Sequence, residues 1–179
     1  MPIERRRAVF FDRDGTLMED AHYCADPALV RVFPEVPDGL RRLKQAGFAV
    51  FIVTNQSGIG RGLMTDAQYQ AVAAEFLRQA GAGSVDGSYY CPDAPGVPSA
   101  CRKPEPGMVL AAAAVHQIDL AASYFVGDKD ADIECGRRAG TRTVLVLTGY
   151  GKQQQCAADL VCEDAAQAIQ WILSAPPPE

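Results

Sequence analysis

The chain has 179 residues, 48% of them hydrophobic, and a formal net charge of −5 at pH 7. This length predicts a single domain over residues 1–179 with a sizeable core, and the acidic balance argues against a nucleic-acid partner. No apolar run approaches the ~20 residues that span a bilayer, and no secretory signal precedes the first strand. We therefore expect a cytoplasmic protein without a membrane partner, with a flexible Pro-rich tail at 175–179.

The cysteines are scattered along the chain. A cytoplasmic protein of this size rarely needs a framework of disulfides, so we expect most of them to be reduced. They are Cys24, Cys91, Cys101, Cys135, Cys156 and Cys162.

The first part of the chain alternates strand and helix patterns. The apolar run that ends at Asp12 predicts a buried strand over 8–12. A helix is predicted over 38–47, where apolar residues recur at helical spacing and Gly47 provides a stop. The continuous apolar run over 48–54 is typical of a strand that a parallel sheet buries on both faces.

The alternation continues towards the C-terminus. Thr65 and Gln68 form a capping box that predicts a helix from 65 to about 80. In the last helix, Trp171 and Ile172 are expected to face the core. Strands that alternate with helices predict an α/β fold, with a doubly wound, mostly parallel sheet flanked by helices. The remaining predicted strands cover 85–90, 123–127 and 143–147, and the remaining helices 106–116, 131–139 and 164–173.

Four polar segments fall at the ends of predicted strands or in the loops beyond them. They cover residues 12–16, 54–58, 102–104 and 127–132. Because parallel strands bring their carboxyl ends to one edge of the sheet, the four segments can converge. Their carboxylates can hold Mg²⁺, while hydroxyl, amide and lysine groups can neutralise a transferring phosphoryl group. This combination of side chains indicates phosphoryl-transfer chemistry.

Each segment taken alone also allows an ordinary structural explanation. Asp12 and Asp14 could form a solvated acidic turn, because Asp-Gly turns are common at surfaces. The glycine-rich segment 58–62 lacks the spacing of a nucleotide-binding loop and is expected to be a flexible loop. Arg13 stands between the two acids, so its side chain is expected to point to the opposite face of the strand, without a catalytic role. The occurrence of all four segments in this order favours the functional interpretation.

The motifs resemble those of the haloacid dehalogenase (HAD) superfamily of phosphotransferases, over residues 8–150. The resemblance implies a HAD-like, Rossmann-like fold and a phosphatase that forms an aspartyl-phosphate. The short intervals between the motifs leave no space for a separate cap domain. The matching stretches are DRDGT at 12–16, TNQSG at 54–58, RKP at 102–104 and GDKDAD at 127–132.

By this resemblance, Asp12 is the nucleophile and Asp14 is the general acid and base. Thr54 and Lys103 bind the oxygens of the transferring phosphoryl group. The implied cofactor is Mg²⁺, and its implied ligands are Asp12, the backbone carbonyl of Asp14, and Asp128, with Asp132 as a support.

An uncapped site is open, so the loops around it must contact the substrate. The candidate residues lie in segments 19–23 and 55–61 and include two further cations. They are Asp20, His22, Tyr23, Asn55, Gln56, Ser57, Arg61, Arg102 and Lys129.

Longer stretches resemble one subfamily, the histidinol-phosphate and heptose-1,7-bisphosphate phosphatases. The heptose enzymes remove the 7-phosphate of D-glycero-D-manno-heptose 1,7-bisphosphate, keep the anomeric phosphate, and serve lipopolysaccharide synthesis. Such a substrate needs a second cationic site, for which Arg102 and Lys129 are candidates and Arg61 is a weaker one. Histidinol phosphate, or another small phosphomonoester, remains the alternative substrate. The matching stretches are DRDGT, TNQSGIGRG, YYCP, CRKPEPGM and VGDKDAD.

Members of this subfamily often hold a structural zinc with three Cys and one His, in the loop that corresponds to 91–101. Cys91 and Cys101 match this pattern, but Asp93 stands where His is expected and Ser99 where a Cys is expected. Two thiolates with Asp and Ser form a poor tetrahedral zinc site. We therefore expect Mg²⁺ but no structural zinc, and a loop stiffened by its prolines.

Two other classes of protein fit part of the pattern. A receiver domain, a non-enzymatic phospho-acceptor, also combines acids, Thr and Lys at the edge of a parallel sheet. It has no need of a second acid two residues after the acceptor. A mutase would have to shield its phosphoenzyme from water, which the expected absence of a cap disfavours. No exposed apolar stripe is evident, so a monomer is expected.

Overall fold

In the computed structural model, which describes residues 5–176, the chain forms a six-stranded sheet whose neighbouring strands are all parallel. The strand order is β3-β2-β1-β4-β5-β6. This confirms the predicted doubly wound α/β fold. Residues 177–179 of the predicted flexible tail lie outside the described part. The strands are β1 (Ala8–Phe11), β2 (Ala49–Asn55), β3 (Gly87–Cys91), β4 (Tyr124–Gly127), β5 (Arg142–Val146) and β6 (Leu160–Cys162).

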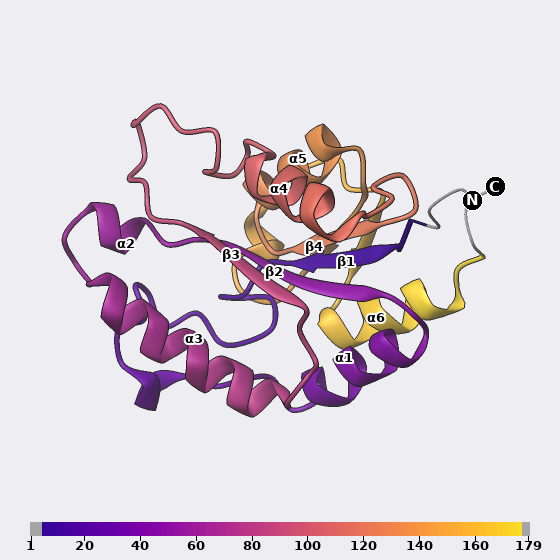
Figure 1. The fold of residues 1–179 in the computed structure, drawn as a ribbon, viewed down its shortest axis with the longest axis horizontal. Coiled ribbons are helices and arrows are strands. Elements are labelled where there is room, and N and C mark those ends of the chain that lie inside the picture. Colours follow the sequence, from indigo (N-terminus) through magenta and orange to yellow (C-terminus); the bar gives the residue numbers. More distant parts are fainter. Residues whose placement is uncertain (1–4, 177–179) are drawn as a thin grey trace.

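Helices cover both faces of the sheet (Figure 1). One face carries α1 (Val36–Gln45), α3 (Asp66–Ala80) and α6 (Ala165–Ser174). The other face carries α4 (Gly107–His116) and α5 (Asp130–Ala139). Along the described chain, no helix combines the length and apolar character needed to cross a membrane. The short helical segments are η1 (Pro27–Leu29), α2 (Ser57–Gly60) and η2 (Gly151–Gln153).

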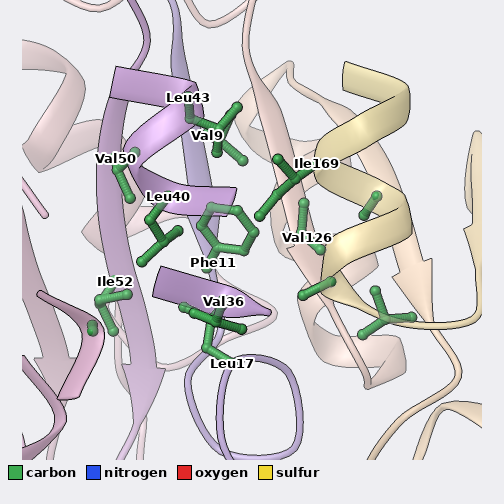
Figure 2. Close-up of a cluster of buried hydrophobic side chains, with 14 of the residues drawn as sticks. Val9, Phe11, Leu17, Val36, Leu40, Leu43, Val50, Ile52, Val126 and Ile169 are labelled. Atoms are coloured by element: carbon green, nitrogen blue, oxygen red, sulfur yellow. The ribbon is translucent and has the colours of Figure 1, made fainter. Parts of the chain in front are cut away.

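Strand β1 lies in the middle of the sheet, and all of its residues are fully buried. Val9 and Phe11 face the side of α1 and α6, where they belong to the same apolar cluster as Ile169 (Figure 2). Ala8 and Phe10 face the side of α4 and α5. Because side chains alternate along a strand and helices cover both faces, every position of β1 must be apolar. The strand is thereby fixed rigidly, and so is the chain that leaves it at Asp12.

The direction of the strand order changes between β1 and β4. Strands β2 and β3 lie on one side of β1, whereas β4, β5 and β6 lie on the other. Phe11 pairs in register with both Ile52 and Val126, so the loops after β1, β2 and β4 start from neighbouring positions. In doubly wound sheets, ligands bind beyond the carboxyl ends of strands at such a switch point. The fold therefore brings together the polar segments that follow these strands.

The capping box predicted for α3 is confirmed. The Thr65 hydroxyl accepts a hydrogen bond from the Gln68 N–H, and the Gln68 side chain accepts one from the Thr65 N–H. Helix α1 begins at Val36, earlier than predicted, because Pro37 falls in its first turn, where proline is tolerated.

Three local predictions are wrong. Segment 58–62 is not simply a flexible loop, since α2 covers its first residues. The sequence pattern also misses β6, which is very short. Trp171 does not face the core: it is 37% exposed, while Ile172 is 2% exposed. The inward face of α6 includes Ile172, and Trp171 lies at its border with its ring edge-on to Tyr124.

Candidate active site

An open cavity of about 550 Å³ lies at the carboxyl edge of the sheet. Its walls come from the loops after β1, β2, β4 and β5 and from the loop before α4. Every predicted site residue lines it except Arg61 and Asp128, and Asp128 is fully buried beside Asp12 and Asp132. The lining residues are Asp12, Asp14, Asp20, His22, Tyr23, Cys24, Thr54, Asn55, Gln56, Ser57, Arg102, Lys103, Lys129, Asp130, Ala131, Asp132, Tyr150 and Gln154.

Lys103 connects two acids inside this cavity. Its Nζ lies 2.8 Å from Asp12 Oδ1 and 2.7 Å from Asp132 Oδ1, and it donates to the Val53 carbonyl at 2.7 Å. Burial alone would favour a neutral lysine. The two carboxylates outweigh burial and hold the pKa of Lys103 above its usual value. Lys103 therefore stays protonated and supplies a fixed positive charge beside Asp12.

Asn55 fixes the loop that carries Lys103. Its Nδ2 donates to the carbonyl oxygen of Lys103 at 3.1 Å, and its Oδ1 accepts from the Lys103 backbone N–H at 3.0 Å. The peptide bond from Lys103 to Pro104 is cis. The sequence predicts a substrate contact for Asn55, and the residue does line the cavity. The oxygen and the nitrogen of the Asn55 amide are both bonded to the backbone of Lys103. The geometry therefore favours a positioning role for Asn55.

Asp12, Asp128 and Asp132 bring three carboxylates together. One oxygen of each lies within 4.8 Å of the others. Burial raises the pKa of Asp128, and the charges of Asp12 and Asp132 add to this effect, to about 8. Burial also tends to raise the pKa of Asp12, but Lys103 and Lys129 outweigh it and hold that pKa below its usual value. Asp12 is therefore ionised, which is the state in which a carboxylate can act as a nucleophile.

Two glycines allow the backbone to approach Asp128 closely. Gly15 and Gly149 have φ values of +85° and +53°, and a Cβ on them would lie 2.5 Å and 2.2 Å from Asp128 Oδ2. Thr16 Oγ1 donates to Asp128 Oδ1 at 3.3 Å, and the Tyr150 N–H donates to Oδ2 at 2.9 Å. Only glycine fits these two positions without strain. In the first motif, Gly15 thus leaves space for Asp128 and Thr16 helps to hold it in place.

The donor set of this acid cluster fits a magnesium ion. Lys103 compensates Asp12 and Asp132, whereas the hydrogen bonds to Asp128 within residues 5–176 come from neutral donors. Clustered carboxylate oxygens suit a hard divalent cation, and such a cation would favour the ionised form of Asp128. Asp132 is already engaged, because its Oδ1 pairs with Lys103 and its Oδ2 accepts the Lys129 N–H at 3.0 Å. This favours Asp12 and Asp128 as direct ligands, with Asp132 as a support.

Asp14 lies in the cavity wall between two donors. Arg13 Nη2 lies 3.1 Å from each of its carboxylate oxygens, and Gln56 Nε2 donates to Oδ2 at 2.9 Å. Gln56 Nε2 also donates to Thr54 Oγ1 at 2.9 Å, which links Asp14 to the predicted phosphoryl-binding threonine. The prediction that Arg13 points away from the acids is wrong. Its buried guanidinium pairs with Asp14, because a buried cation needs an anionic partner.

Part of the cavity wall is formed by the loop that carries His22 and Tyr23. Their φ values of 46° and 52° are in the left-handed region, which is sparsely populated by residues with side chains. The His22 N–H donates to Asp20 Oδ1 at 2.9 Å, and His22 Nδ1 lies 3.2 Å from the Tyr150 hydroxyl. Lys129 Nζ lies 4.9 Å from the Tyr150 ring centroid and 3.9 Å from Asp20 Oδ2. Local backbone strain of this kind clusters at ligand-binding sites.

Arg102 is a further cation on the cavity wall. Its Nη1 donates to the Asp93 carbonyl at 3.1 Å, and its backbone N–H donates to Ser99 Oγ at 3.0 Å. Partial burial lowers the pKa of Arg102, and the positive charge of nearby Arg61 lowers it further. Arg61 itself does not line the cavity, and its guanidinium lies 5.9 Å from the Tyr23 ring centroid. An anion at Arg102 would relieve the repulsion between the two cations.

The sequence interpretation misses several residues that line the cavity. Tyr150 follows β5 at its carboxyl end, and that position is the signal that could have identified it. Gln154 is held by the chain itself, since its Oε1 accepts from the Asp130 N–H at 2.9 Å. Asp130 and Ala131 lie within segment 127–132 but are assigned no role there, and Cys24 carries no chemical signal in the sequence. The missed residues are Cys24, Asp130, Ala131, Tyr150 and Gln154.

Cys91 and Cys101 form a disulfide. This bond is not predicted from the sequence, from which most of the cysteines are expected to be reduced. Asp93 Oδ2 lies 3.5 Å from Cys91 Sγ, and Ser99 Oγ lies 3.3 Å from Cys101 Sγ. The four positions that the family pattern assigns to zinc therefore converge, with Asp and Ser in place of His and Cys. The described cysteines that are free are Cys24, Cys135, Cys156 and Cys162.

Comparisons of sequence place the chain among known phosphatases. A family model described as HAD-hydrolase-like matches residues 100–168. The D-glycero-beta-D-manno-heptose-1,7-bisphosphate 7-phosphatase of Salmonella typhi is 38% identical over 178 residues, which cover 93% of this chain and 89% of that protein. The D-glycero-D-manno-heptose-1,7-bisphosphate 7-phosphatase of Chlorobaculum tepidum is 34% identical, with 97% of this chain and 98% of that protein covered.

Solved structures agree with the sequence relatives. The D,D-heptose 1,7-bisphosphate phosphatase from B. bronchiseptica, complexed with magnesium and phosphate, matches with a TM-score of 0.86 at 33% identity, over 93% of this chain and 98% of that one. The corresponding phosphatase from Burkholderia thailandensis matches with a TM-score of 0.72 at 28% identity, over 95% of this chain and 100% of that one. The chain therefore belongs to the HAD superfamily, in the family of the heptose-1,7-bisphosphate 7-phosphatases.

Proposed function

We propose that this protein is a Mg²⁺-dependent phosphatase that converts D-glycero-D-manno-heptose 1,7-bisphosphate into the 1-phosphate through an aspartyl-phosphate. The observation that carries the proposal is the buried Asp12 carboxylate, ion-paired with Lys103 at the end of β1. Relatives that span nearly the whole chain bear the name of this activity. We further propose that a single uncapped domain acts as a monomer in the cytoplasm.

In the first step, a carboxylate oxygen of Asp12 attacks the phosphorus of the 7-phosphate. The bond between phosphorus and the sugar oxygen breaks as the aspartyl-phosphate forms. The leaving alkoxide takes the proton of Asp14, which lines the same cavity as Asp12. A covalent intermediate divides one difficult displacement into two easier ones.

In the second step, water attacks the phosphorus of the aspartyl-phosphate. Asp14 is now ionised and accepts a proton from this water. The bond between phosphorus and the Asp12 oxygen breaks, which releases inorganic phosphate and restores the Asp12 carboxylate. Asp14 ends the cycle in the protonation state in which it began, so no other proton carrier is required.

Thr54 and Lys103 stabilise the charge of the transferring group. Thr54 Oγ1 accepts a hydrogen bond from Gln56, so its own hydrogen is free to be donated to a phosphoryl oxygen. Lys103 holds its positive charge 2.8 Å from the nucleophilic carboxylate. Fixed donors of this kind, aimed at the charge that develops in the transition state, are a large part of phosphoryl-transfer catalysis.

Asp12, Asp128 and the backbone carbonyl of Asp14 would hold Mg²⁺. When bound, the ion neutralises negative charge on the carboxylates and on the phosphoryl group. Asp132 supports this arrangement through its contacts with Lys103 and the Lys129 backbone.

The phosphate that is not cleaved needs its own cations. Arg102 and Lys129 both line the cavity, and Arg61 adds positive charge close to Arg102. A cavity of about 550 Å³ is in the range expected for a small-molecule substrate. Histidinol phosphate is the alternative substrate, but it would leave the cation at Arg102 without an anionic partner. This favours the bisphosphate.

The experiment that tests the function is a panel of substrates with Mg²⁺ and with EDTA. It compares heptose 1,7-bisphosphate in both anomers with histidinol phosphate and fructose 1,6-bisphosphate. A large preference in kcat/KM for one heptose bisphosphate, abolished by EDTA, is expected. Preference for histidinol phosphate would change the substrate and keep the chemistry. If no substrate releases phosphate and a long-lived aspartyl-phosphate forms instead, the protein is a phospho-acceptor.

A further inference from the structure

Arg13 is the largest fully buried side chain of the described residues, although arginine normally reaches solvent. It is 1% exposed. Its guanidinium carbon lies 5.5 Å from the Tyr69 ring centroid, and its Nη2 lies 3.1 Å from both carboxylate oxygens of Asp14. Burial disfavours the charge, but Asp14 outweighs it and holds the pKa of Arg13 above its usual value. Arg13 is a permanent cation with one anionic partner.

The surroundings of Arg13 do not resemble a site selected for stability alone. Its Nε and Nη1 are buried and have no hydrogen-bond partner among residues 5–176. A buried cation with unsatisfied donors is destabilising, and a packed apolar side chain of similar size would usually be as stable or better. A buried arginine with unsatisfied donors is expected where its charge has a functional role.

The contacts of Asp14 indicate what that function is. Arg13 contacts both oxygens from the buried side, and Gln56 contacts Oδ2 at 2.9 Å. Two donors at two points fix the orientation of a carboxylate. Gln56 also bonds Thr54, so the orientation of Asp14 is tied to the place where the phosphoryl group is bound.

We propose that Arg13 is a positioning residue that holds the Asp14 carboxylate in the orientation needed to donate a proton to the leaving oxygen and later to accept one from water. The inference rests on the proposed function. It adds a role for the residue between the two acids of the first motif, whose guanidinium contacts Asp14 and lies near the Tyr69 ring.

The dependence on the leaving group separates this role from a general structural one. A sugar alkoxide is a poor leaving group and requires the proton of Asp14, whereas p-nitrophenolate leaves without a proton. The second step requires Asp14 for both substrates. Loss of positioning should therefore slow both steps for the sugar phosphate but only the second step for p-nitrophenyl phosphate.

The test compares Arg13→Met and Arg13→Lys with the wild type and with Arg137→Met. Methionine fills the buried space without charge, and lysine keeps the charge but not the forked donors. Arg137 pairs with Glu134 in an exposed turn of α5, so its variant is a matched control with the same substitution. For heptose bisphosphate, kcat of Arg13→Met should fall about 10–100-fold with little change in KM. Arg13→Lys should recover part of this loss, and Arg137→Met should match the wild type.

For p-nitrophenyl phosphate, stopped-flow traces of Arg13→Met should show a burst approaching one nitrophenolate per protein, followed by slow turnover. A crystal structure of the variant should show Asp14 displaced from its contact with Gln56. Equal losses on both substrates without a burst would overturn the proposal, as would Asp14 in its original place. If Arg13→Met does not fold, Arg13→Lys carries the same comparison. If the proposed function is wrong, the wild-type protein will release no phosphate. The crystal structure of Arg13→Met would then still test whether Arg13 positions the Asp14 carboxylate.

Discussion

Lys103 and Asp12 form an ion pair of 2.8 Å, with their side chains only 3% and 6% exposed. The same ammonium group lies 2.7 Å from Asp132, so one lysine compensates two of three clustered carboxylates. Removing one partner of a buried ion pair leaves the remaining charge desolvated, which is strongly destabilising. The lysine that is proposed to bind the transferring phosphoryl group is therefore also needed for the fold.

Replacing Lys103 with Met tests this dual role. The variant should lose activity, and its free energy of unfolding in EDTA should fall by about 3–5 kcal/mol, as expected when a buried pair is broken. Urea denaturation measures this change. Arg41→Met is the control, because its pair with Asp38 is largely exposed, and it should lose no more than about 1 kcal/mol. A Lys103→Met protein as stable as the wild type would contradict the account of the buried cluster.

Replacing Asp12 with Asn should remove the nucleophile and keep the fold. The amide has nearly the same shape and takes one negative charge out of the acid cluster. We expect kcat to fall by at least about 10³-fold, the scale seen when a covalent nucleophile is removed. The Tm should stay within about 5 °C of the wild type. Phosphate release and thermal denaturation measure the two effects, and substantial remaining turnover would exclude Asp12 as nucleophile.

Metal removal should make stability depend on pH through Asp128. Burial and the neighbouring acids raise the pKa of Asp128 from 3.8 to about 8 in the folded protein. Between these values the folded state binds more protons than the unfolded state, so stability falls as pH rises, by up to about 1.4 kcal/mol per pH unit. In EDTA the Tm should therefore be lower at pH 8 than at pH 6.

Added Mg²⁺ should counter this loss. The ion favours the ionised carboxylate, so it should raise the Tm more at pH 8 than at pH 6. The variant Asp128→Asn should lose most of both the pH dependence and the stabilisation by Mg²⁺. Differential scanning fluorimetry at the two pH values gives all of these quantities. A Tm in EDTA that rises from pH 6 to pH 8 would show that the sign of the effect is wrong.

Replacing Arg102 with Ala should weaken bisphosphates more than monophosphates. The expected loss in kcat/KM is about 10–100-fold for heptose 1,7-bisphosphate, in line with the loss of a charge-assisted contact, and smaller for p-nitrophenyl phosphate. Arg142→Ala is the control, since Arg142 is exposed at the start of β5. Equal losses on both substrates would remove Arg102 as the cation for the retained phosphate.

Much of the fold and the convergence of the site follow from local patterns in the sequence. The continuous apolar strands require cover on both faces, so a parallel sheet and its active edge follow from them. Asp12, Thr54 and Lys103 could be placed at that edge because they follow apolar strands or stand in the loop beyond one. The capping box at Thr65 could also be identified, since both of its partners are close in sequence.

Other features depend on contacts between distant segments. Nothing near Arg13 in the sequence shows that its side chain is buried over Tyr69, because that ring comes from α3. The amide of Asn55 is occupied by the Lys103 backbone, a contact across 48 positions of the chain. Tyr150 reaches Asp128 and His22 only through the packing of loops from different strands. Local spacing carries no information about such pairings.

The most direct measurement is the location of phosphate on the protein during turnover. Asp14→Asn protein is mixed with p-nitrophenyl phosphate and Mg²⁺, quenched in acid after milliseconds, digested and analysed by mass spectrometry. We expect one phosphate per chain on Asp12, formed together with a burst of nitrophenolate and absent in EDTA or in Asp12→Asn. Nitrophenolate release without phosphate on the protein, or with phosphate on another residue, would contradict it.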